Sequence, residues 1–191
     1  MLKPQRTQRS QRKNPVGCHP RSHYDILSNH TVLQSKSQPS KGSIPAISSY
    51  HDFSAFKLYM HDVGLLGAMS GTSSSMLLDG NTLFTNFKGA LAEQFVLQEL
   101  AANGIEPSYW TSDSGNAEVE FVIQGEKEVF PIEAKAGINT KAKSLRVYME
   151  LFNPPYAIRT SLQPYHDGEN VKDIPLYAFG IHVSRLLSPA R

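Results

Sequence analysis

The pattern of hydrophobic and polar residues changes along the 191-residue chain. Before Ile44 the apolar side chains are scattered, without the 3.6-residue period of a helix or the two-residue period of a strand. After it they become dense, and we expect the apolar run at residues 56–66 to be buried. This change predicts one folded domain over residues 49–181, followed by a tail over 182–191.

Residues 83–103 carry the strongest helical pattern in the chain. They contain no proline, are rich in Leu, Ala, Gln and Glu, and end at Asn103-Gly104, a typical C-terminal stop. At 100° per residue, Glu93 lies among apolar residues on one face, with Gly89 one turn before it. A carboxylate in such surroundings either meets a cation or hydrogen bonds, or reaches solvent at the edge of the helix, and helical geometry leaves both interpretations open.

Three strand-like segments follow this helix, at residues 108–111, 118–123 and 129–135. Turn residues at 124–127 predict a hairpin between the second and the third segment. Alternation places Glu133 and Lys135 on one face of the third strand. In a favourable register, Glu120 of the second strand lies opposite Glu133, with the two Cβ atoms about 5 Å apart.

The last third of the chain completes the predicted architecture. Residues 143–152 read as a helix closed by Asn153, Pro154 and Pro155, residues 156–160 as a strand, and residues 176–181 as a final strand-like piece. The order of helix, three strands, helix and strand predicts an α/β sandwich with a mixed sheet.

Composition separates the first part of the chain from the rest. Residues 1–50 carry eight basic side chains against one acidic, whereas residues 51–191 carry eleven basic and sixteen acidic ones. We therefore expect residues 1–48 to form a disordered basic tail or a truncated linker, able to touch phosphates non-specifically. The single cysteine excludes a disulfide framework and a cysteine-based zinc site. No apolar run reaches the roughly 18 residues needed to span a membrane, and the expected location is cytoplasmic.

The acids and the lysine of the predicted hairpin form the candidate chemical site. Two neighbouring carboxylates, Glu120 and Glu133, repel each other unless a cation lies between them, and Mg²⁺ is the natural occupant. Lys135 would then orient or help to deprotonate an attacking water, or offset charge on a phosphate, and Glu93 would steer the cation or its water. An acid–lysine pair on the solvent-facing side of a strand is a common alternative that contributes little to stability.

A second group of candidate residues is the basic cluster at Lys141, Lys143 and Arg146. At the start of the second helix these side chains would hold a backbone phosphate of a nucleic acid. A solvated helix end explains them equally well.

A helical Glu, a strand acid and an E-x-K strand together resemble the PD-(D/E)XK nuclease superfamily, whose core is αβββαβ. Within it, the chain is similar to the domain of unknown function that lies C-terminal to the ATPase module of prokaryotic AAA+ ATPases. The similar segments are residues 56–60, 62–66, 88–96, 117–121, 131–137 and 143–146. The resemblance covers roughly residues 49–180 and implies a restriction-endonuclease-like core. It also implies that Glu93, Glu120, Glu133 and Lys135 occupy the active-site positions of that core.

Two departures from the family shape the functional hypotheses. Glu120 stands where the family usually has Asp, and its extra methylene displaces a bound cation unless the backbone adjusts. No G-x-x-x-x-G-K-[ST] motif is present, so the chain should not hydrolyse ATP through a P-loop. The leading hypothesis is an accessory or regulatory module that binds nucleic acid or another protein chain, such as an ATPase. The alternatives are a Mg²⁺-dependent nuclease acting on DNA or RNA, and a degenerate fragment without independent activity.

Overall fold

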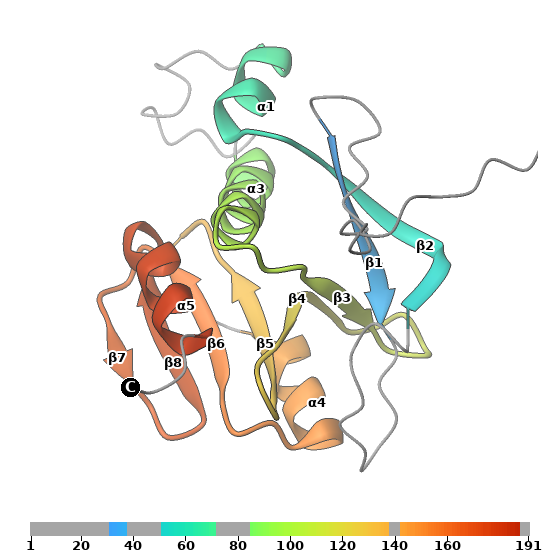
Figure 1. The fold of residues 1–191 in the computed structure, drawn as a ribbon, viewed down its shortest axis with the longest axis vertical. Helices are drawn as coiled ribbons and strands as arrows, with labels where there is room; N and C mark the ends of the chain where they lie inside the picture. The colour runs from blue at the N-terminus through green and yellow to red at the C-terminus, as the bar shows by residue number, and fades with distance from the viewer. Residues whose placement is uncertain (1–30, 38–50, 72–84, 138–141, 188–191) are drawn as a thin grey trace, which may run out of the picture.

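The computed structural model describes residues 31–37, 51–71, 85–137 and 142–187 as a mixed α/β fold (Figure 1). Its strands are β1 (Thr31–Ser37), β2 (His51–Met60), β3 (Ser108–Thr111), β4 (Glu118–Gln124), β5 (Val129–Ala134), β6 (Ala157–Ser161), β7 (His166–Asp167) and β8 (Val171–Pro175). Its helices are α1 (Val63–Met69), α3 (Thr85–Ala102), α4 (Lys143–Phe152), the short 3₁₀ helix η3 (Leu176–Ala178) and α5 (Phe179–Leu187). The strands of these described residues form one eight-stranded sheet in the order β2-β1-β3-β4-β5-β6-β8-β7.

Helices cover both faces of the central strands (Figure 1). On one face, α3 and α5 pack on β4, β5 and β6 in an apolar cluster that includes Leu100, Phe121, Ile132 and Phe179. On the other face, α4 buries Leu145 and Tyr148 in a second apolar cluster with Trp110 of β3. The Trp110 and Tyr148 rings meet edge to face at a centroid distance of 5.3 Å, an arrangement that aromatic pairs prefer. These two layers hold the central strands between them.

The central part of the predicted architecture is confirmed. From α3 to β6 the order is helix, three strands, helix and strand, with β3, β4 and β5 antiparallel and β6 parallel to β5. The helix expected at residues 143–152 is α4 with the same bounds, and it ends where Asn153 adopts a left-handed conformation with φ of 47°. Within the described part of the chain, no helix is long and apolar enough to cross a membrane.

The C-terminal prediction was wrong. Residues 176–181 form η3 and the start of α5 rather than a strand, and α5 runs past the boundary expected at residue 181. Phe179 and Val183, four residues apart, are both fully buried in the apolar cluster under α3, which favours a helix at this position. The preceding strands were missed because β7 has only two residues and because Lys172 and Asp173 interrupt the apolar residues of β8.

The disorder expected over residues 1–48 was wrong for residues 31–37, which form β1; the other residues of that segment lie outside the described ranges. This strand pairs antiparallel with β2 along seven residues, so backbone hydrogen bonds between the strands help to hold it in the sheet. Its Gln34 is fully buried and donates from Nε2 to the backbone oxygen of Glu120, 2.9 Å away. The strand β1 is thereby anchored beside the predicted site.

The burial expected for residues 56–66 was also wrong. Phe56 and Leu58 of β2 are 52% and 55% exposed, and no residue of α1 is buried. Their strand lies at the edge of the sheet, where one face of a strand meets solvent.

Candidate functional site

Three of the predicted residues meet where β4 and β5 separate. The regular pairing of these strands ends at Phe121 opposite Ile132. Beyond that pair, the carboxylate of Glu120 takes the place of a backbone partner, because its Oε2 accepts a hydrogen bond of 3.1 Å from the N–H of Ala134. The Lys135 ammonium is ion-paired with Glu133 Oε1 and lies 3.8 Å from Glu120 Oε1. We call Glu120, Glu133 and Lys135 the acidic cluster.

An irregularity in β4 aims Glu120 into this position. Trp110 pairs with Val119 and Ser108 with Val122, so two residues of β4, Glu120 and Phe121, lie opposite one residue of β3. Such a bulge breaks the alternation of a strand and redirects side chains. The side chains of β4 therefore do not simply alternate: Val119 and Val122 pack together under α4, whereas Phe121 packs under α3.

The two carboxylates of the acidic cluster are largely removed from water. Glu133 is 3% exposed, and its Oε2 has no hydrogen-bond partner among the described residues. Burial, and after it the charge of Glu133, raise the pKa of Glu120 to about 8, although the charge of Lys135 opposes the shift. A buried oxygen without a partner and a carboxyl that resists ionisation both indicate a site short of positive charge.

Lys135 remains protonated in this environment. Burial alone would lower the pKa of Lys135, but its hydrogen bond with Glu133 and the charges of Glu120, Glu133 and Glu93 outweigh burial and raise the pKa. A lysine held as ammonium can offset negative charge or donate a hydrogen bond, whereas it is a poor base.

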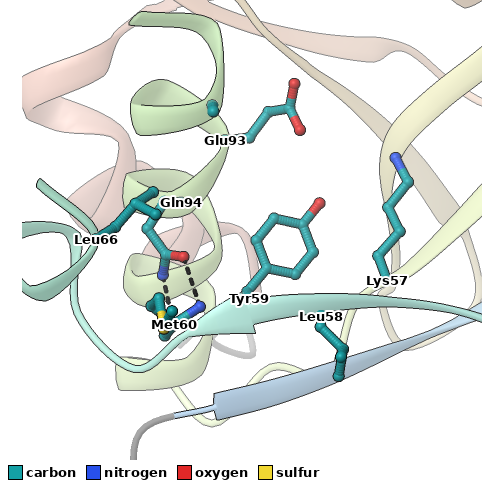
Figure 2. Close-up of a pocket in the computed structure, with 8 residues that line it drawn as sticks. Lys57, Leu58, Tyr59, Met60, Leu66, Glu93 and Gln94 are labelled. Atoms are coloured by element: carbon teal, nitrogen blue, oxygen red, sulfur yellow. Dashed lines mark hydrogen bonds between the residues drawn. The ribbon is translucent and has the colours of Figure 1, made fainter. Parts of the chain in front are cut away.

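Glu93 of α3 lies beside the acidic cluster. Burial raises the pKa of Glu93; the charge of Lys57 opposes this shift most strongly, and Lys135 and Glu133 also act on it. The helix position that the sequence left open between burial and solvent is thus partly buried and electrostatically coupled to the cluster. Figure 2 shows its carboxylate on the same side of β2 as the Tyr59 hydroxyl.

Strand β2 supplies side chains next to the site that the sequence did not single out. Lys57 Nζ lies 2.5 Å from Glu118 Oε1 and 4.9 Å from the centre of the Tyr109 ring, and the Tyr59 ring centre lies 6.2 Å from that of Phe121. These contacts bring β2 to strands that are not its neighbours in the sheet. The sequence feature that could have identified these residues is their two-residue spacing, which places Lys57 and Tyr59 on the same face of a strand.

Gln94 of α3 fixes β2 against the helix (Figure 2). It is 1% exposed; its Oε1 accepts from the Met60 N–H at 2.9 Å, and its Nε2 donates to the Met60 carbonyl at 2.7 Å. Replacing Gln94 with Leu leaves both backbone groups of Met60 without these partners. We expect a loss of about 2 kcal/mol in the free energy of unfolding, measured by urea denaturation. The control Asn116→Leu, at an exposed turn position, should change stability by much less; equal losses would contradict the role of this pair of hydrogen bonds.

The basic cluster gains no support from its surroundings. Lys141 lies outside the described residues, and Lys143 and Arg146 belong to the first turn of α4, which packs on the face of the sheet opposite α3. Arg146 is 76% exposed in its side chain and lies 3.7 Å from Glu150 Oε1. This geometry is that of a solvated helix end, and phosphate binding there stays a prediction.

Cation binding at the acidic cluster would depend on more than side chains. Among the described residues, no group of three or more His, Cys, Asp or Glu side chains is arranged to hold a metal ion. Mg²⁺ is commonly bound through one or two carboxylates, with water and substrate phosphate oxygens as its other ligands. Glu120 and Glu133, one with an unpartnered oxygen, fit that smaller set.

Among the comparisons with known proteins, the match that was found spans the part of the chain that carries the acidic cluster. No curated protein and no solved structure matches the chain. A family model does match, from residue 88 in α3 to residue 179 at the start of α5, and this stretch includes Glu93, Glu120, Glu133 and Lys135. Residues 88–179 are thereby identified as a match to the Domain of unknown function DUF4143.

Proposed function

We propose that this domain binds a divalent cation, Mg²⁺, at Glu120 and Glu133 and cleaves phosphodiester bonds of DNA or RNA as a PD-(D/E)XK-type nuclease. The observation that carries the proposal is the acidic cluster itself. Two buried carboxylates from adjacent strands share one lysine, and Glu133 Oε2 has no partner within the described residues. The helix, three strands, helix and strand around the cluster are in the order of a restriction-endonuclease-like core.

The residues of the cluster divide the chemistry between them. A bound divalent cation lowers the pKa of its water and polarises a phosphate oxygen. Lys135, held as ammonium, offsets the charge that accumulates on the phosphate during attack. Glu93 stands beside the cluster, where its carboxylate accepts a proton or a hydrogen bond from the attacking water.

A titration of the protein with Mg²⁺ and Mn²⁺ tests the proposal. Calorimetry should detect one divalent cation per chain for the wild type, and Glu133→Gln should weaken binding at least tenfold, because the amide removes one anionic ligand. A plasmid nicking assay on the same samples should show cleavage by the wild type and none by Glu133→Gln. Glu126→Gln, an exposed acid in the turn between β4 and β5, is the matched control and should behave as wild type. A wild type that neither binds cation nor nicks sinks the proposal.

A second candidate is a non-catalytic module that binds nucleic acid or regulates an AAA+ ATPase, the association implied by the resemblance. The specific observation in its favour is that Lys135 already pairs with both carboxylates, which gives the cluster a structural role without any metal. The Glu at position 120, where the family usually has Asp, favours it too. Cation binding without nicking would support this candidate over the first.

A further inference from the structure

A groove of about 580 Å³ lies beside the acidic cluster, between β2, α1 and α3 (Figure 2). Its walls are mostly apolar, from Tyr59, Met60, Leu66 and Ala90. The volume is within the range of roughly 300–1,000 Å³ that small-molecule sites occupy. Tyr59 and Glu93 both line the groove, and the Tyr59 ring centre lies 6.2 Å from that of Phe121, the residue after Glu120 in β4. Because the charges of Lys135 and Glu133 also act on Glu93, the groove adjoins the acidic cluster.

We propose that this groove binds an unpaired base of the nucleic acid whose backbone phosphate lies at the acidic cluster, which makes single-stranded or locally unpaired nucleic acid the substrate class. The inference rests on the proposed function, because it assigns the phosphate to that site. A base stacked inside a duplex cannot enter a recess in the protein surface unless it leaves the stack.

The side chains of the groove match the chemistry of a base. Tyr59 contributes an aromatic ring to the wall, and bases of single strands stack on aromatic side chains regardless of sequence. The Tyr59 hydroxyl is buried and has no hydrogen-bond partner among the described residues. The polar edge of a base would supply one once the side chains that cover the hydroxyl move aside. Burial raises the pKa of Tyr59 well above its ordinary value, and the hydroxyl therefore remains a donor.

Charged side chains around the groove determine where the phosphates of a bound strand could lie. Lys57 lines the groove and, in Figure 2, lies on the same side of β2 as the Tyr59 hydroxyl. Its ammonium pairs with Glu118, and a backbone phosphate would replace that carboxylate as its partner. Glu93, Glu118 and the acidic cluster repel phosphates, so binding should strengthen when a divalent cation offsets them. A polyanion without an unpaired base would gain the lysine contact alone.

Fluorescence anisotropy with labelled oligo(dT) and oligo(U) tests the inference, with a blunt duplex of equal length as the third probe. Each probe is measured in Ca²⁺ and in EDTA, with the full chain. Ala90→Trp places an indole in the groove from an exposed helix position and should weaken binding of the better single strand about tenfold. Ala101→Trp, at an exposed position of the same helix outside the groove, is the matched control and should bind as wild type. Lys57→Gln should lower the slope of log Kd against log salt by about 0.7, the value of one phosphate contact.

The outcomes separate this inference from the proposed function. Equal affinities of Ala90→Trp and wild type, tighter binding of the duplex than of both single strands, or no binding of any probe would overturn the groove. If the protein binds a cation and nicks plasmid, but Ala90→Trp has no effect, the proposed function is supported and the base-binding inference is rejected. Conversely, Ala90→Trp could weaken single-strand binding in EDTA and in the Glu133→Gln background while the wild type shows no nicking. That result would support the base site and reject the nuclease. If Ala90→Trp unfolds by circular dichroism, the salt slope of Lys57→Gln decides: an unchanged slope contradicts the inference.

Discussion

Replacing Lys135 with methionine is expected to lower the free energy of unfolding at pH 8 by about 3 kcal/mol. The substitution keeps the apolar stem but removes the ammonium that pairs with Glu133 and faces Glu120, so two buried carboxylates lose their partner. In the variant the folded state binds protons more tightly than the unfolded state does, and stability must rise as the pH falls. Urea denaturation at pH 8 and pH 5 should therefore show a large loss at the first pH and a smaller loss at the second.

Two variants control this result. Lys127→Met removes an exposed lysine from the turn between β4 and β5 and should change stability by less than about 0.5 kcal/mol. Adding Glu133→Gln to Lys135→Met removes one of the two carboxylates left without a cationic partner. The double variant should recover part of the free energy of unfolding lost at pH 8. The same loss at both pH values would mean that Lys135 contributes through the packing of its stem, and the electrostatic account of the cluster would be wrong.

The middle of the fold could be predicted because local pattern and tertiary packing agree there. The three-residue spacing of Leu145 and Tyr148 places both on one buried face of α4, and Asn153 followed by Pro154 ends the helix. The hairpin of β4 and β5 is defined by its turn and by apolar residues on both strands. The family match covers this same region.

The outer parts could not be predicted, since their stability comes from partners distant in sequence. The strand β1 has five polar residues among its seven, and its buried Gln34 bonds to the backbone of Glu120, 86 residues later. The last helix, α5, contains β-branched and aromatic residues that favour a strand locally, but Phe179 and Val183 fill the space under α3. Tertiary contacts decided both segments.

The candidate site divides in the same way. Spacing along one strand brings Glu133 and Lys135 together, and the hairpin turn brings Glu120 to them. The bulge that directs Glu120 has no sequence signal of its own, because neither glycine nor a break in apolar residues marks it. The wall formed by Lys57 and Tyr59 was missed because its place depends on the contact of β2 with α3 through Gln94.

In cation-free buffer, the free energy of unfolding of the wild type should fall by about 3 kcal/mol more than that of Glu120→Gln between pH 5 and pH 8. Burial and the charge of Glu133 raise the pKa of Glu120 from 4.5 to about 8 in the folded protein. Over that interval the folded state holds a proton that the unfolded state has released, so stability decreases as the pH rises. Glu120→Gln carries no titrating group at this position, and its profile should be flatter when both are measured by urea denaturation.

A divalent cation should offset this loss of stability at high pH in the wild type, because it binds the ionised form of Glu120. With 5 mM Mg²⁺, added as a titrant of known concentration, the gain in the free energy of unfolding should be larger at pH 8 than at pH 5. Glu120→Gln should gain little at either pH, and Glu126→Gln should follow the wild type. If the wild type and Glu120→Gln share one pH profile without cation, Glu120 is already ionised by Lys135. The cluster would then be electrically satisfied as it stands, and the case for a metal would lose its physical basis.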